Sequence, residues 1–311
     1  MTRINKSILC MLIFGISASL SAATKNDFDL TGSLIPIDEI LQGGPPRDGI
    51  PSIDKPVFVS ASQAKFMQPK DRVIGITVNG ESRAYPINIL NWHEIVNDTI
   101  QGRPVSVTYC PLCGTGIVYE GNQGGRTLKL GVSGLLYNSD VLLYDRQTET
   151  LWSQILSKGI SGPLKGQKLT MIESSQTRWS KWLKQHPNTK VLSTQTGYSR
   201  DYRSSPYGNY DNNTNLYFPV SRESRRYHPK ERVLGITING KTKAYPFKEL
   251  AKLGTTQLKD TFQGQALTIN FDVPNRDGNI RDAAGRPVEL VNGFWFAWYA
   301  FHQQTAVFTV K

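Results

Sequence analysis

The chain has 311 residues, of which 39% are hydrophobic and 20% are charged, so it is long enough for one large or two medium-sized globular domains and too apolar for a disordered protein. The formal net charge of +11 comes from basic residues that are scattered along the chain, and together with the lack of a recognition motif this argues against nucleic-acid binding. The 27 glycines, 17 prolines and 13 tyrosines favour strands and turns over long helices, and we expect a mainly β fold with a few short helices, a β-rich α+β protein.

Residues 1–23 have the pattern of a secretory signal peptide. A basic start precedes an apolar run, Ile8 to Leu20, which is shorter than a membrane span, and Ser21-Ala22-Ala23 provides a small-residue cleavage site. Cleavage would remove Cys10 and lower the formal net charge from +11 to +9. We therefore expect a periplasmic or secreted protein with no integral membrane segment once the signal has been removed.

The segment after the signal is rich in glycine and proline, and we expect it to wrap over the surface as a loop. A hairpin is predicted at residues 71–86, where two runs of β-forming residues flank Asn79-Gly80, a pair typical of tight two-residue turns. A short helix or turn that carries His93 and Glu94 should follow it.

The next predicted element is a strand, a tight turn and a second strand within Val105 to Tyr119, VSVTYCPLCGTGIVY. Pro111 fixes one φ angle of the turn, and Gly114 can adopt positive φ directly after the second cysteine. Such a turn would point the sulfur atoms of Cys110 and Cys113 at the same place. These are the only cysteines that remain after signal cleavage.

Residues 121–166 are predicted to form three or four short strands. The continuous apolar run from Val141 to Tyr144 suits a buried strand. The polar triplet Asn138-Ser139-Asp140 stands at the mouth of this strand, and a turn with local side-chain caps is favoured there over a catalytic role.

An internal duplication organises the chain. The hairpin sequence of residues 71–86 recurs at residues 231–246, a spacing of 160 residues, and the pattern W-x-x-W-x-x-x-H-x-x-T begins at Trp179 and again at Trp295, a spacing of 116. We expect two pseudo-repeated β units about a pseudo-twofold axis, each ending in a short helix with tryptophans in the core. The predicted segments are the signal peptide, 1–23; an N-terminal wrapping segment, 24–66; the first β-rich repeat, 67–195; a linker loop, 196–226; and the second, degenerate repeat, 227–311.

The two copies differ at the residues that can carry chemistry. His93 of the first copy aligns with Leu253 of the second, and the two cysteines align with Asp272 and Asn275. The first copy is therefore the candidate for function, and the second copy is expected to serve as scaffold.

Several blocks of the first copy together resemble a family of secreted bacterial and archaeal proteins, the domain of unknown function 3179. The resemblance extends over most of the chain from about residue 60 onward. It implies membership of that family and carries over no activity, cofactor or catalytic residue. The blocks are Asn91 to Asp98, Val107 to Thr115, Val132 to Asp140, Tyr144 to Arg146, and Leu151 to Gln154.

The first hypothesis for function is a metal site. The sequence C-P-x-C-G has the form of a metal-binding knuckle, and two thiolates with one imidazole would leave an open coordination position, which suits copper or zinc. The predicted ligands are Cys110, Cys113 and His93. Further candidates for the site are Glu94, Ser139, Asp140 and Asp145. No organic cofactor is expected.

Three alternatives remain open. The CxxC spacing is that of a periplasmic thiol–disulfide redox protein, although the flanking strands differ from the helix that such pairs usually begin. A structural disulfide would close only a small loop and stabilise the fold little. A binding or assembly module that uses the second copy is the third alternative. No catalytic residue is assigned, and the partners are not identified.

Overall fold

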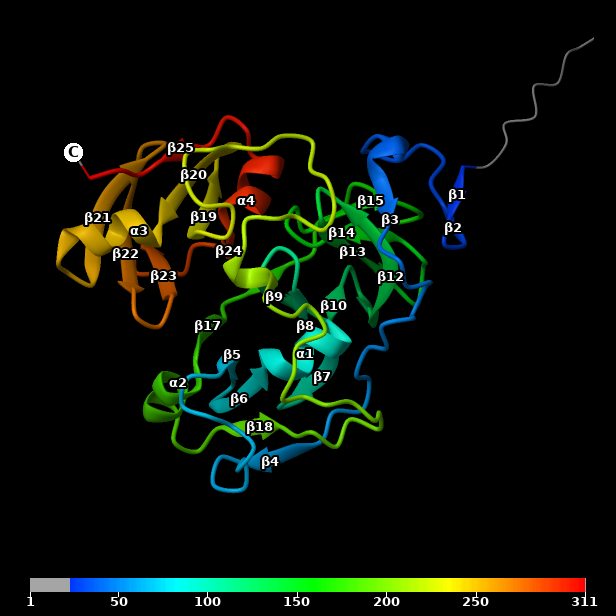
Figure 1. The fold of residues 1–311 in the computed structure, drawn as a ribbon, viewed down its shortest axis with the longest axis horizontal. Coiled ribbons are helices and arrows are strands. Elements are labelled where there is room, and N and C mark those ends of the chain that lie inside the picture. Colours follow the sequence, from blue (N-terminus) through cyan, green and yellow to red (C-terminus); the bar gives the residue numbers. More distant parts are fainter. Residues whose placement is uncertain (1–22, 311) are drawn as a thin grey trace, which may run out of the picture.

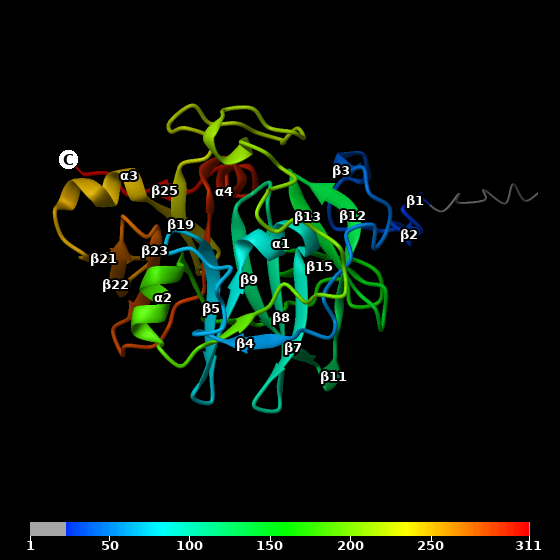
Figure 2. The same cartoon turned by 60° about the horizontal axis from the view of Figure 1, so that its bottom comes forward.

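The computed structural model describes residues 23–310, which leaves the predicted signal peptide outside the described residues except for Ala23. The chain is mainly β, with 42% of residues in strands and 12% in helices, as predicted. Five sheets of three to five strands are arranged as a five-bladed β-propeller, and their strands can be followed in Figures 1 and 2. From the sequence we expected two β units. The structure has two sheets that contain the repeated hairpins, two that follow these hairpins in the chain, and a fifth made mainly of residues 130–161.

The first sheet contains the hairpin predicted at residues 71–86. Its strands β5 and β6 pair from Val73↔Pro86 to Val78↔Glu81. Asn79 and Gly80 in the turn have φ of 47° and 82°, as a tight two-residue turn between twisted strands requires. The strand order is β17-β5-β6-β18-β4. The bounds are β4 Phe58–Ser60, β5 Arg72–Val78, β6 Glu81–Pro86, β17 Ser175–Arg178 and β18 Lys190–Leu192.

A second sheet repeats this arrangement with the order β24-β19-β20-β25. The β19–β20 pairs run from Val233↔Pro246 to Ile238↔Lys241, each 160 residues after its counterpart. β20 pairs with β25 in parallel, as β6 pairs with β18. The bounds are β19 Arg232–Ile238, β20 Lys241–Pro246, β24 Leu290–Phe294 and β25 Ala306–Val307.

A short helix that begins with tryptophan packs on each of these hairpins. The two helices are α2, Trp179–Gln185, and α4, Trp295–Phe301. Trp182 lies so close over Gly75 that a Cβ atom there would be 2.3 Å from the indole ring, and Trp298 lies over Gly235 at the same 2.3 Å. The histidine that follows each helix stacks on the tryptophan of its own helix. The ring centroids are 3.9 Å apart for His186 on Trp182 and 4.0 Å apart for His302 on Trp298. These tryptophans are core residues, as predicted.

Two further sheets follow the hairpins in the chain, with the orders β16-β9-β8-β7 and β21-β22-β23. Short helical segments lead into them: α1 Ile87–His93 in the first copy, and α3 Phe247–Leu250 with the 3-10 turn η3 Ala251–Leu253 in the second. The strand bounds are β7 Ile95–Ile100, β8 Arg103–Cys110, β9 Thr115–Glu120, β16 Met171–Ile172, β21 Gln257–Phe262, β22 Gln265–Asp272 and β23 Asp277–Asp282.

The extra segment of the first copy forms the fifth sheet, in the order β15-β14-β13-β12-β3. Residues 121–166 were predicted to form three or four strands and form six: the four consecutive strands of this sheet and, before them, the small hairpin β10–β11. The bounds are β10 Asn122–Gln123, β11 Arg126–Thr127, β12 Leu130–Tyr137, β13 Asp140–Asp145, β14 Leu151–Ser153 and β15 Lys158–Ser161.

The N-terminal segment does more than wrap over the surface. β3 pairs with β12, and β4 pairs with β18, so this segment adds an edge strand to two sheets. Residues 196–226 are irregular apart from the turn η2, and they run across the first copy toward the second. The remaining bounds are β1 Thr24–Lys25, β2 Phe28–Asp29, η1 Ile37–Glu39, β3 Ile40–Gln42 and η2 Tyr210–Asn212.

A large cluster of buried side chains joins three of the sheets. It brings Cys110 and Cys113 together with Trp152 of the extra sheet and with Phe294 and Trp298 of the second copy. The thiols are thus core residues, and both copies surround them. Within residues 23–310 no helix is long and apolar enough to cross a membrane.

Candidate metal centre

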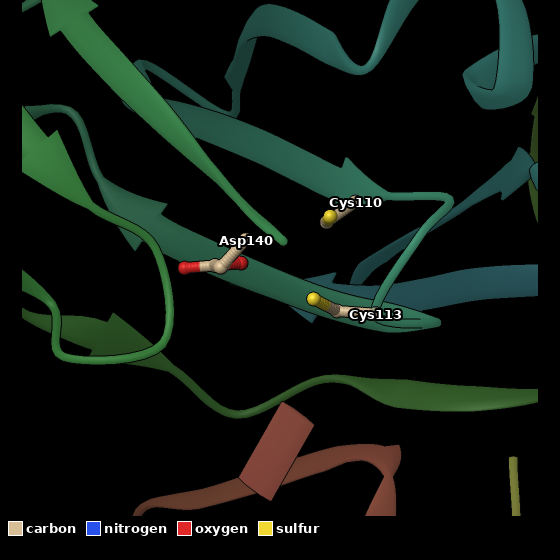
Figure 3. A group of neighbouring side chains, drawn as sticks. All are labelled: Cys110, Cys113 and Asp140. Atoms are coloured by element: carbon tan, nitrogen blue, oxygen red, sulfur yellow. The ribbon is translucent and has the colours of Figure 1, made fainter. Parts of the chain in front are cut away.

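The turn between β8 and β9 carries the two cysteines as predicted. Cys110 pairs with Thr115 across the hairpin, and the four residues between them form the turn, which closes with Gly114 at a φ of 62°. Cys110 and Cys113 are free thiols with exposures of 1% and 0%. Figure 3 shows the sulfur atoms directed into the same space.

A second hairpin turn reaches the same space from the extra sheet. Asn138 and Ser139 link β12 to β13 with φ of 52° and 62°, and Tyr137 pairs with Asp140 on either side of them. This is a two-residue turn, as favoured from the sequence. The backbone carbonyl of Ser139 accepts hydrogen bonds from Cys113 Sγ at 3.3 Å and from Cys110 Sγ at 3.7 Å.

Asp140, the residue after this turn, completes a group of three potential metal ligands. One carboxylate oxygen of Asp140 and the sulfur atoms of Cys110 and Cys113 all lie within 4.8 Å of one another (Figure 3). The Oδ2 atom of Asp140 accepts a hydrogen bond from the Ile155 amide at 3.0 Å. The Oδ1 atom is buried and has no hydrogen-bond partner among the described residues. A buried carboxylate oxygen without a partner is costly, and a bound cation would satisfy it.

Burial dominates the electrostatics of the group. It raises the pKa of Asp140 to about 8, against the hydrogen bond from the Ile155 amide, which lowers it. Burial, and after it the hydrogen bond with Cys110, raises the pKa of Cys113 well above its ordinary value. Without a cation, these groups therefore favour their protonated forms at neutral pH. A metal ion would reverse this preference, because its charge stabilises the anionic form of each ligand.

The second copy holds the cysteine turn in place. The Phe294 amide donates to the Cys113 carbonyl at 2.9 Å, and Arg232 Nη1 donates to the Gly114 carbonyl at 2.8 Å. Gln176 Nε2 of the first copy donates to the same Gly114 carbonyl at 2.9 Å. The turn is therefore fixed on both sides, which suits a site that must keep two sulfur atoms in one geometry.

Two buried cations lie near the group. Lys230 and Arg232 are only 5% and 4% exposed. Lys230 Nζ lies 3.8 Å from the centre of the Tyr210 ring, and it donates to the carbonyls of Asn213 and Asn215. The Tyr210 hydroxyl is buried without a partner in the part of the chain that is described.

His93 is not part of this group. Its Nδ1 lies 2.7 Å from the Pro51 carbonyl, and its Nε2 lies 2.7 Å from the Tyr202 hydroxyl, so both ring nitrogens already have partners. The expectation that His93 supplies the third ligand is thus not supported by its placement, and Asp140 takes that place in the structure. His93 instead ties the end of α1 to the N-terminal segment and to residues 196–226.

The other candidate residues are distributed around the group. The Ser139 hydroxyl donates to the Phe218 carbonyl at 2.7 Å, so only its backbone carbonyl faces the sulfurs. The Asp145 carboxylate accepts from Thr148 and from Trp152 Nε1, which fixes the far end of β13. Glu94 lies beside a pocket and accepts a hydrogen bond from the Tyr207 hydroxyl at 3.1 Å.

A pocket of about 510 Å³ adjoins the cysteine turn. Leu112 of the turn and Val141, the neighbour of Asp140, are in its wall, together with Glu94 and Tyr207. A second cavity, of about 230 Å³, lies between β9 and β23, and none of the three potential ligands lines it. The larger pocket is therefore the one that is relevant to the candidate site.

The pKa of Glu94 predicts how stability depends on pH. Burial raises this pKa to about 7 from its ordinary 4.5, against the Tyr207 hydrogen bond that lowers it. A raised carboxyl pKa stabilises the fold fully below pH 4.5, and this stabilisation is lost as the pH rises through 7. For chelator-treated protein, we expect the unfolding free energy to fall by about 2.5 kcal/mol more in wild type than in Glu94→Gln between pH 5 and 8.

Urea unfolding of the two proteins across this pH range measures the difference directly. Asp140 titrates in the same direction in both proteins, and because the Glu94 charge contributes to its raised pKa, the difference between the two slopes reports Glu94 together with its effect on Asp140. Equal slopes for wild type and Glu94→Gln would show that the Glu94 carboxyl is not held in its protonated form.

Comparison with known proteins identifies a family but indicates no activity. A family model described as "Protein of unknown function (DUF3179)" matches residues 47–286, which confirms the resemblance seen in the sequence. The matched range contains both hairpins and all three members of the group. Neither the curated proteins nor the solved structures include a match.

Proposed function

We propose a metal-binding function for this chain, which belongs to the DUF3179 family, with Cys110, Cys113 and Asp140 as the protein ligands. The observation that carries the proposal is the buried Asp140 carboxylate, which has one oxygen within 4.8 Å of both free thiols and whose Oδ1 atom has no hydrogen-bond partner among residues 23–310. Stability alone does not favour an unpaired carboxylate oxygen in a hydrophobic core. A metal ion at this position would satisfy the oxygen and both sulfurs together.

The donor set fits zinc best. Two thiolates and one carboxylate are ordinary Zn²⁺ ligands, and three protein ligands leave the fourth tetrahedral position open, as in catalytic zinc sites. The unpaired Tyr210 hydroxyl is a potential hydrogen-bond donor to a group bound in that position. Copper is the second candidate, since two thiolates favour Cu(I), but the carboxylate is a harder ligand than Cu(I) prefers.

Metal binding in this site exchanges protons for the ion. Each thiol loses one proton when its sulfur binds, and Asp140 loses one wherever its carboxyl was protonated. The Ser139 carbonyl, which accepts from both thiols in the metal-free form, then loses its donors. Binding is therefore expected to strengthen as the pH rises.

The redox alternative rests on the same free and neighbouring thiols. Thiol exchange requires an accessible sulfur with a low pKa. The burial of both cysteines and the raised pKa of Cys113 favour the metal proposal over it.

Two wider expectations belong to the same proposal. We place the protein in the periplasm or outside the cell, on the basis of the signal-like residues 1–23. We also propose that the two halves are copies of one unit of which only the first retains the ligands. The equal registers of β5–β6 and β19–β20 support this second expectation.

Elemental analysis of protein purified without a metal-binding tag tests the proposal. We expect close to one zinc or copper ion per chain in wild type and none in Cys110→Ser. Metal-free wild-type protein whose thiols form a reversible disulfide would support the redox alternative instead. Metal that is retained in Cys110→Ser would place the ion elsewhere.

A further inference from the structure

The pocket beside the cysteine turn has the size and lining of a small-molecule site. Its volume of about 510 Å³ lies within the range of typical ligand pockets, which are concave and mainly apolar. Five separate segments form the wall: the N-terminal segment at Ile50, the end of α1 at Trp92, the cysteine turn at Leu112, the extra sheet at Leu136, and residues 200–218 at Phe218. The pocket thus exists only because the extra sheet and the connecting segments cover the first copy.

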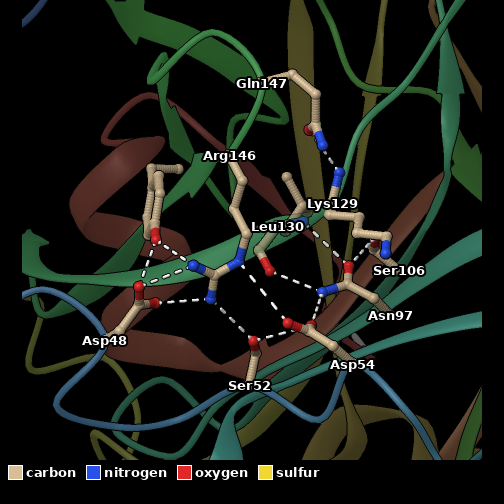
Figure 4. Close-up of polar contacts among 10 residues, drawn as sticks. Asp48, Ser52, Asp54, Asn97, Ser106, Lys129, Leu130, Arg146 and Gln147 are labelled. Atoms are coloured by element: carbon tan, nitrogen blue, oxygen red, sulfur yellow. Dashed lines mark hydrogen bonds and ion pairs between the residues drawn. The ribbon is translucent and has the colours of Figure 1, made fainter.

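The N-terminal part of this wall is firmly held. Arg146 pairs with Asp48 at 2.8 Å and donates to Ser52 at 3.2 Å (Figure 4). Asp54 accepts from Asn97, which also bonds to the backbone of Leu130. These contacts tie residues 48–54 to the end of β13 through Arg146 and to β7 through Asn97, on both sides of the segment that lines the pocket. The pocket is therefore preformed, which lowers the entropic cost of binding a ligand.

Glu94 has a backbone conformation that is unusual for its residue type. It ends α1 with a φ of 57° and a ψ of −30°, and its amide donates to the Leu90 carbonyl at 2.7 Å. Positive φ brings Cβ close to the backbone, so glycine is the default residue at such a helix end. The second copy has glycine there: Gly254, 160 residues later, follows η3 with a φ of 64°.

The side chain of Glu94 adds a second cost to the strained backbone. It is only 6% exposed, and the Tyr207 hydroxyl is its one hydrogen-bond partner among the described residues, on Oε1. No basic side chain of residues 23–310 pairs with it. Glycine would remove both the strain and the buried carboxyl, as the second copy demonstrates. The first copy keeps a residue that the fold alone does not favour, and strain of this kind is concentrated at functional sites.

From these observations we infer that the pocket binds a small, mainly apolar molecule that carries a hydroxyl group, and that Glu94 hydrogen-bonds this hydroxyl. Glu94 and Arg200 are the only charged residues in the lining, and Arg200 is exposed. Apart from the half-buried Asn91, the covered part of the pocket offers one polar pair, Glu94 with Tyr207, in an apolar wall. A hydroxyl group both donates and accepts, so it can pair with a carboxyl group in either protonation state.

The inference is independent of the metal ion and is tested with two matched probes, 1-naphthol and naphthalene. They share an apolar body and differ in the hydroxyl group. Trp92 lines the pocket, so binding to the full chain can be followed by quenching of tryptophan fluorescence and checked by calorimetry. We expect saturable binding of one naphthol per chain, at least 10-fold tighter than naphthalene.

Glu94→Gly is the decisive variant, because its backbone suits the position and the fold should be preserved. We expect it to lose at least 10-fold in affinity for naphthol and to bind naphthalene as wild type does. Leu136→Trp, which fills the pocket, should weaken both probes. Equal binding of the two probes by wild type, no binding of either, or naphthol affinity unchanged in Glu94→Gly would each overturn the inference.

Metal content, measured on the same samples, separates this inference from the proposed function. Glu94→Gly is expected to hold as much metal as wild type does. A metal-free protein that still discriminates naphthol from naphthalene through Glu94 would uphold the pocket and refute the metal site.

Discussion

Cys113→Ser and Asp140→Asn are expected to lower metal affinity by more than about 100-fold, whereas His93→Gln retains the ion. Loss of an outer-shell partner alone costs about 10–100-fold in affinity, and each of the first two substitutions removes a proposed ligand. His93 is the matched control because the sequence favoured it as a ligand, while the structure directs both of its ring nitrogens to other partners. Competition with a chromophoric chelator measures the affinities.

Comparing the metal affinities of Asp140→Asn and His93→Gln distinguishes two ligand sets, the two cysteines with Asp140 and the two cysteines with His93. Far-ultraviolet circular dichroism of each variant ensures that a lost metal is not the result of lost folding. If His93→Gln released the metal and Asp140→Asn kept it, the group would have been assigned to the wrong third ligand, and the fold around α1 would differ from the one described.

The second large effect is on stability, and it should occur equally in both copies. Gly75→Ala and Gly235→Ala are each expected to destabilise the protein by about 3 kcal/mol, because the new methyl group would lie 2.3 Å from the indole ring of Trp182 or Trp298. Neither ring can move away easily, since the indole nitrogen donates to Thr189 or Thr305 at 3.0 Å. Denaturant unfolding provides the measurement.

Thr77→Ala is the control on the same strand as Gly75. Thr77 is exposed, so its substitution should change the unfolding free energy by no more than about 0.5 kcal/mol. A large loss in Gly75→Ala with none in Gly235→Ala would show that the two tryptophan helices do not pack on their sheets in the same way.

Local features of the fold were predictable because the residues that determine them are neighbours in the sequence. Asn79-Gly80 specifies a tight turn through its backbone preferences alone, and the cysteine turn follows from Pro111 and Gly114. The position of the tryptophans in the core follows from their spacing in a helix. The repeat then extended each of these inferences to the second copy.

The assembly of the site was not predictable in the same way. Asp140 reaches the thiols only because the turn at Asn138 and Ser139 docks on the cysteine hairpin, a contact between elements that periodicity does not encode. The backbone of Glu94 pairs with Tyr109, the residue before Cys110. The side chains of His93 and Glu94 nevertheless point away from the thiols, because the end of α1 directs them to the N-terminal segment and to the pocket. Lys230 is buried by tertiary contacts, although the arginines shortly before it, Arg225 and Arg226, are exposed.

One signal for Glu94 was already present in the sequence. Alignment of the two copies at a spacing of 160 residues places Glu94 opposite Gly254. A glycine in one copy at the end of a short helix indicates positive φ, so a glutamate at the same place in the other copy indicates a position under strain. The sequence comparison does not say why the strain is kept, and the structure supplies a reason by placing Glu94 in the wall of a pocket.

X-ray absorption spectroscopy at the metal edge of untagged, full-length protein examines the proposed coordination most directly. The spectrum should contain two sulfur neighbours at about 2.3 Å and lighter atoms at about 2.0 Å, from Asp140 and from the ligand in the open position, if the ion is zinc. A first shell made only of oxygen and nitrogen, or protein that carries no metal and joins Cys110 to Cys113 in a disulfide, would contradict the assignment.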